Sequence, residues 1–154
     1  MKKNRFIPAI ALALFTSAAS VQAHDDAYLD TQQAPHGGQL RMAGAYHLEL
    51  VVDKSTPQAT DKPVVVYVTD HADQKFPTDG STGTAIILAA KSKTSVALVP
   101  DGDNRLRGMG RYASTPDMKV VVTFTAKGQP PETARFTPLL KATQDDAGHH
   151  KHKH

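Results

Sequence analysis

Apolar and polar residues alternate with a period of two along most of the chain, the pattern of strands that bury one face. The clearest stretches are YHLELVV at 46–52, VVVYVTD at 64–70 and KVVVTFTA at 119–126. Weaker stretches of the same kind predict strands at 38–42, 83–90, 94–100, 105–112 and 133–139. Turn-forming residues separate these segments, and no segment has the period of 3.6 that an amphipathic helix requires.

Seven or eight short strands with turns between them favour an all-β fold. The spacing predicts an antiparallel β-sandwich with an immunoglobulin-like outline, and a small barrel is the alternative. We expect one β-sandwich domain over residues 38–140, preceded by a polar leader at 24–37. The polar, histidine-rich tail at 141–154 is expected to be disordered.

Residues 1–23 have the pattern of a secretory signal peptide. Three basic residues precede an apolar run at 6–15, which is too short to span a bilayer, and Val-Gln-Ala at 21–23 is a small-x-small cleavage site. An N-terminal membrane anchor is the alternative. We expect cleavage after Ala23, export to a bacterial periplasm, and no membrane anchor afterwards.

Charge and composition narrow the classes of function. The chain has 18 basic and 15 acidic residues, and three of the basic ones lie in 1–23, so the exported part is balanced. With no basic stripe and no Trp, nucleic acid is not an expected partner. The absence of Cys means that a metal site would use His, carboxylate, Met or backbone ligands. No catalytic motif such as a nucleophile elbow or HExxH is present, so an enzyme is not expected.

Histidines in the first half of the exported chain are the first candidates for metal ligands. His47 and Glu49 lie two apart on a predicted strand, so both point to the face opposite the core, which we expect to be exposed. His36 lies just before a Gly-Gly turn, and a hairpin would bring it near His47. His71 ends the following strand. This set suits zinc or copper; the alternative is an ordinary solvated strand face.

Both ends of the exported chain add candidates. Cleavage after Ala23 would make His24 the N-terminus, where its amine and ring chelate Cu(II), and a copper monooxygenase with such a brace is a further alternative. The tail carries His149, His150, His152 and His154, interleaved with Lys, which favours a gene-encoded segment over a purification tag. Such a tail binds Zn(II), Cu(II) or Ni(II) with weak selectivity.

Three methionines, Met42, Met109 and Met118, have thioethers suited to Cu(I), although core filling is the favoured role.

Four segments carry a resemblance to a known group of proteins: PHGGQLRMAGAYHLELVV, VVVYVTDH, FPTDGSTGTA and DGDNRLRG. They resemble small periplasmic β-domain proteins encoded among the heavy-metal resistance and efflux functions of Gram-negative bacteria. They are also similar to small β-domains near the N-termini of metal-efflux adaptors, whose long helices and lipoyl-like segments this chain lacks. The resemblance covers residues 35–137. It implies metal handling, with His36, His47, Glu49 and His71 as positions to test and a metal-efflux or metal-resistance protein as a partner.

These observations predict a non-catalytic periplasmic protein that binds a divalent transition metal, copper or zinc, and buffers or delivers it. The alternative is a structural or interaction β-sandwich module with no metal role.

Overall fold

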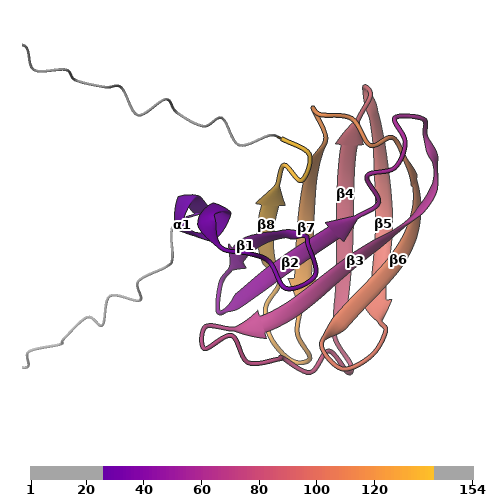
Figure 1. Cartoon of the computed structure of the whole chain (residues 1–154). Helices are drawn as coiled ribbons and strands as arrows, with labels where there is room; N and C mark the ends of the chain where they lie inside the picture. Colours follow the sequence, from indigo (N-terminus) through magenta and orange to yellow (C-terminus); the bar gives the residue numbers. More distant parts are fainter. Residues whose placement is uncertain (1–25, 141–154) are drawn as a thin grey trace, which may run out of the picture.

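The computed structural model describes residues 26–140 and has one short helix and eight strands (Figure 1). They are α1 (Asp26–Thr31), β1 (Gln39–Ala43), β2 (Tyr46–Val52), β3 (Thr60–Asp70), β4 (Thr82–Ala89), β5 (Ser92–Pro100), β6 (Arg105–Tyr112), β7 (Lys119–Thr125) and β8 (Glu132–Phe136). The predicted all-β antiparallel class is confirmed, and β2 and β6 have their predicted bounds. The predicted signal peptide, His24 and the histidine-rich tail lie outside the described residues.

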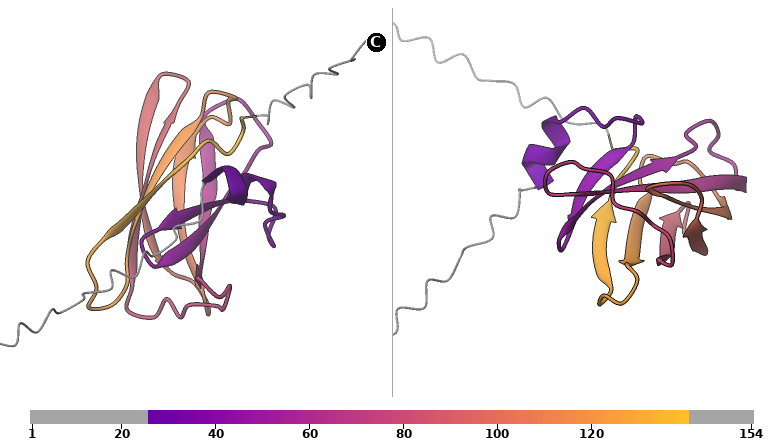
Figure 2. Two further views of the ribbon diagram at one scale, coloured as in Figure 1. Left: turned by 90° about the vertical axis from the view of Figure 1, so that its left-hand side faces the viewer. Right: turned by 90° about the horizontal axis from the view of Figure 1, so that it is seen from below.

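The strands form one sheet in the order β1-β2-β3-β6-β5-β4-β7-β8, and every pairing is antiparallel. The sheet curls so that β2 and β3 cross obliquely in front of β8, β7 and β4 (Figures 1 and 2). Its two edge strands, β1 and β8, approach each other. The backbone N–H of Thr137, just after β8, donates to the Gln39 side chain of β1 at 2.8 Å. The sheet is therefore nearly closed around one core.

The core follows directly from the alternation in the sequence. Alternate residues of β3 and β7 are buried, and on β2 Leu48 and Leu50 are fully enclosed. The other strands contribute the rest of the core, chiefly Val64, Val66, Val68, Ile87, Val96, Leu98, Leu106, Val120, Val122, Phe124 and Phe136. Burying a side chain of this size stabilises the fold by about 1.5–3 kcal/mol. Among residues 26–140 no helix is long and apolar enough to cross a membrane.

Strand β3 begins four residues earlier than the sequence pattern predicts, at Thr60. Three of the four added residues are polar, and one of these, Lys62, is buried. Its ammonium donates to Ser114 Oγ at 2.8 Å and to the Thr56 carbonyl at 3.2 Å, and lies 4.6 Å from the centre of the Tyr112 ring. These partners offset the cost of burying the Lys62 charge. Residues 60–63, which the sequence pattern assigns to a loop, can therefore belong to the strand.

Close approach of β5 and β6 requires glycine at position 108. A Cβ atom on Gly108 would lie 2.2 Å from the Ala97 carbonyl oxygen and 2.6 Å from Val96 Cγ1. The first of these atoms belongs to the backbone, so relief of the clash would separate the two strands.

We expect Gly108→Ala to lower the free energy of unfolding by about 3 kcal/mol, because overpacking against a backbone atom cannot be relieved by a rotamer change. Urea denaturation followed by far-ultraviolet circular dichroism measures the loss. Gly128→Ala is the matched control: a Cβ there meets no atom within 4 Å, and its φ of +73° costs only about 1 kcal/mol. Equal losses in the two variants would show that the β5–β6 approach does not limit stability.

Candidate functional site

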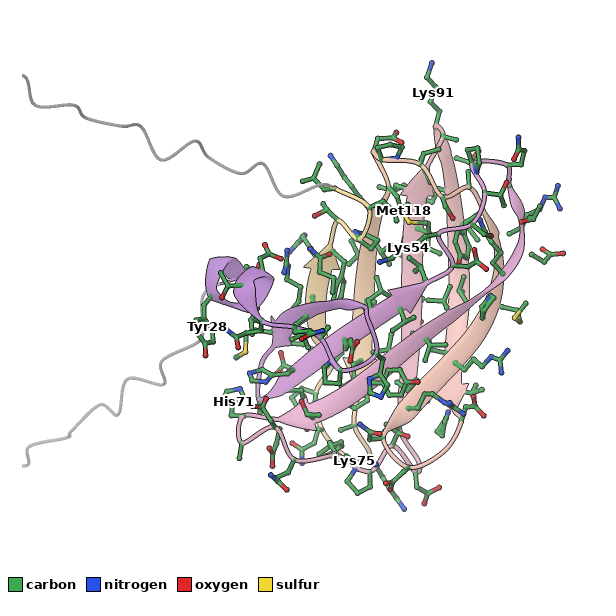
Figure 3. All side chains as sticks on the ribbon, in the orientation of Figure 1. Tyr28, Lys54, His71, Lys75, Lys91 and Met118 are labelled. Carbon is green, nitrogen blue, oxygen red and sulfur yellow. The ribbon has the colours of Figure 1, made fainter. Side chains whose placement is uncertain are left out.

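A cavity of about 280 Å³ lies on the outer face of β2 and β3, beneath α1 and the loop that follows it. Four side chains of the two strands form its floor: His47, Glu49, Tyr67 and Thr69. The segment before β1 supplies the cover, including Tyr28, Leu29 and His36. Figure 3 shows Tyr28 and His71 on the same side of the molecule.

Helix α1 lies within the segment that the sequence predicts to be a polar leader, where no helical period is visible. Leu29 is its buried apolar residue, at 4% exposure. The buried Arg41 of β1 fixes the helix in place, since its guanidinium contacts both oxygens of Asp30 at 2.7 and 3.1 Å and lies 3.6 Å from Asp26. A two-pronged ion pair of this kind is strong because both hydrogen bonds are charge-assisted. Six residues are too few for a helical period to show in the sequence.

Glu49 is the buried centre of the site, at 3% exposure. Its Oε1 accepts from the backbone N–H groups of His36 at 2.8 Å and Gly38 at 3.0 Å. Its Oε2 lies 2.7 Å from His36 Nδ1. Both oxygens of this carboxylate therefore hold the loop before β1 against β2.

The Gly-Gly turn and Tyr67 complete this arrangement. A Cβ atom on Gly38 would lie 2.4 Å from the Leu50 carbonyl oxygen and 2.8 Å from Glu49 Cγ, so the loop can approach β2 only with glycine here. The His36 ring stacks on Tyr67 with its centroid 3.5 Å away and the planes 3° apart. Tyr67 is the cross-strand partner of Glu49. The pairing of β2 with β3 therefore places the Tyr67 ring beside the Glu49 carboxylate.

A second histidine–carboxylate pair lies on the same cavity. His47 is buried at 5% exposure, and its Nδ1 lies 3.1 Å from Asp73 Oδ1. The His71 ring stacks beside His47, with centroids 5.3 Å apart and planes 21° apart. Asp73 comes from the loop after β3 and lines the cavity with His36, His47 and Glu49.

These contacts determine where each imidazole carries its proton. A carboxylate only accepts hydrogen bonds, so the Nδ1 atoms of His36 and His47 must donate. In the neutral rings the lone pair then lies on Nε2. The carboxylates thus determine which nitrogen of each neutral ring can bind a ligand.

The structure brings the four predicted body residues to one region in two groups. His36 meets Glu49, and His47 meets His71 and Asp73. The expectation that the face of His47 and Glu49 is solvent-exposed is wrong, because the folded-back leader covers it. Within the described part of the chain, no group of three or more His, Cys, Asp or Glu side chains is close enough to hold a metal ion.

The sequence analysis missed Tyr67 and Asp73. Tyr67 could be found only by also predicting that the strands at 46–52 and 64–70 pair, since it lies opposite Glu49 in that pairing. Asp73 lies in a turn-rich loop and carries no comparable signal.

No protein-family model, curated protein or solved structure matches the chain.

We expect Glu49→Gln to move the His36 proton from Nδ1 to Nε2. The amide oxygen can still accept from the two backbone N–H groups, but the amide nitrogen would face Nδ1 and can only donate. The lost charge-assisted bond should lower the free energy of unfolding by about 1–3 kcal/mol. Imidazole ¹⁵N chemical shifts report the tautomer directly.

Asp73→Asn serves as the control for this change. The Asp73 side chain is 85% exposed and can turn to water, so its loss should cost less stability and leave the His36 tautomer as it is. An unchanged His36 tautomer in Glu49→Gln would contradict the assignment.

Acid should weaken the attachment of α1. The hydrogen bonds from Arg41 lower the pKa of Asp30 below its ordinary value of 3.8. A lowered pKa means that the ion pair contributes fully above pH 3.8 and is lost as the pH falls through the lower, folded-state value. The carboxyl ¹³C shift of Asp30 should titrate below 3.8, and the amide shifts of α1 should follow it. Asp30→Asn should abolish that step; a midpoint above 3.8 would show that the pair does not hold the helix.

Proposed function

We propose that the chain is a periplasmic protein that binds a divalent transition metal, copper or zinc, and buffers it or hands it to a metal-resistance or efflux protein. It acts by ligand exchange and not by catalysis. The observation that carries the proposal is the pair of histidine–carboxylate contacts on one cavity, His36–Glu49 and His47–Asp73.

The contacts match what a metal-binding histidine needs. Such a ring commonly donates its second N–H to a carboxylate, which fixes the tautomer and raises the basicity of the ligating nitrogen. His36 and His47 both have this arrangement, with Nε2 as the ligating atom. Neutral imidazole suits Cu(II) and Zn(II). Glu49 supports His36 here and does not itself contact the metal, since both its oxygens hold the loop.

An exchangeable cargo suits this site better than a structural ion. A structural zinc site is closed by four protein ligands, whereas two histidines leave positions for water or for a ligand from a partner. The cavity of about 280 Å³ has room for an ion with waters. His36 is 42% exposed and offers a ligand at the entrance.

Features of the sequence support the same proposal. A signal peptide at 1–23 would deliver the chain to the periplasm, and four histidines at 149–154 would capture metal without a preformed site. His24 would become the N-terminus and add an amine–imidazole chelate. The resemblance of residues 35–137 to proteins of metal resistance agrees with this role.

Calorimetric titration with Zn(II) and Cu(II) at neutral pH tests the proposal. The full exported chain would be compared with a variant in which His149, His150, His152 and His154 are all replaced by Asn. We expect the tail variant to retain a one-to-one site. Adding Glu49→Gln to it should weaken that site by about 10–100-fold, the usual effect of losing the partner of a metal-bound histidine.

Glu132→Gln is the matched control, because it makes the same chemical change on β8, away from the lining of the cavity. Its affinity should equal that of the tail variant. Loss of all binding with the tail histidines would instead assign metal capture to the tail and favour a structural or interaction role for the domain.

A further inference from the structure

Met42 lies directly opposite His47 in the pairing of β1 with β2. Residues opposite each other in an antiparallel pair share a face, with Cβ atoms about 4.5–5.5 Å apart. The thioether therefore belongs to the outer face, beside a buried histidine, and not to the core. The side chain is unbranched and has three torsions, so its sulfur can adjust to a ligand.

His71 approaches the same place from the end of β3. Its ring lies 5.3 Å from that of His47, and its Nε2 lies 3.2 Å from the carbonyl oxygen of Gly44, in the turn between β1 and β2. A carbonyl only accepts, so His71 Nε2 donates and the lone pair of its neutral ring lies on Nδ1. Two metal–nitrogen bonds of about 2 Å place ring nitrogens up to about 4 Å apart, which rings at this separation can reach.

The donor set therefore consists of one thioether and two imidazoles. A thioether is a soft ligand that selects Cu(I), whereas imidazole alone serves several metals. We propose that Met42, His47 and His71 form a site for Cu(I), which rests on the proposed function through the shared His47. Copper in its reduced state is then the cargo for which this end of the β1–β2 hairpin is specific.

The other described methionines lack this environment. Met118 is fully buried in the core, and Met109 is 57% exposed on β6 opposite Pro63. Met42 is half-buried, and among the methionines at 26–140 it is the one whose cross-strand partner is a histidine. Because the chain has no Cys, any sulfur bound to copper must come from methionine.

The test uses the full exported chain with its four tail histidines replaced by Asn. Cu(I) is supplied without oxygen and competed with the chromogenic chelator bicinchoninate, and Zn(II) is titrated separately. Met42→Leu removes a direct ligand, so it should weaken Cu(I) binding at least as much as the roughly 10–100-fold that loss of an outer-shell partner causes, and leave Zn(II) binding unchanged. The swap conserves volume, so the fold should persist. Met109→Leu is the control and should change neither affinity.

X-ray absorption of the Cu(I) complex gives a second readout. A sulfur neighbour should be present in the parent protein and in Met109→Leu, and absent in Met42→Leu. Equal Cu(I) affinity in Met42→Leu, or a complex with only nitrogen neighbours, would overturn the Cu(I) site while Zn(II) binding keeps the proposed function intact. Sulfur-bound Cu(I) with no Zn(II) binding would support this site and overturn the divalent-metal proposal.

Discussion

A carboxylate buried on the outer face of the sheet holds the candidate site together. Glu49 is almost fully enclosed, and an isolated charge there would cost several kcal/mol. Three N–H groups of the loop before β1 offset that cost: two from the backbone and one from the His36 ring. The loop in turn encloses Glu49, so the cover and the buried charge require each other. The stack of His36 on Tyr67 and the cavity itself follow from this contact.

The same logic applies, with the sign of charge reversed, at the neighbouring strand. Arg41 of β1 is buried and needs the carboxylates of α1, chiefly that of Asp30. Asp30 is half exposed, but its removal would leave the buried Arg41 guanidinium without its main carboxylate partner, so the ion pair attaches the helix to β1. Two buried charges of opposite sign thus secure the leader at both ends. The part of it that the structure describes is therefore packed on the domain as part of the fold.

Sequence reasoning succeeded where the physical signal is local. Period two gave the strands, and β2 was obtained in full because residues 46–50 alternate and two β-branched valines follow. It failed where the signal is nonlocal. The polar start of β3 depends on Lys62 meeting Ser114, more than fifty residues away, and the burial of His47 depends on a leader that folds back. The predicted shared face of His47 and Glu49 was right, but only tertiary structure could show that it is covered.

The two histidine–carboxylate pairs are opposite in exposure, which bears on how cargo would move. In one pair the ring is accessible and the carboxylate is buried: the side chain of His36 is 42% exposed and that of Glu49 is 4% exposed. In the other pair the ring is buried and the carboxylate is in solvent: the side chain of His47 is 6% exposed and that of Asp73 is 85% exposed. Under the proposed function, an incoming ion meets His36 first, on a ring that Glu49 and Tyr67 hold still. It reaches His47 second, on a ring whose carboxylate can turn away. An outer ligand held by buried contacts and an inner ligand with a solvent-exposed partner favour stepwise exchange, which a protein that passes metal on requires.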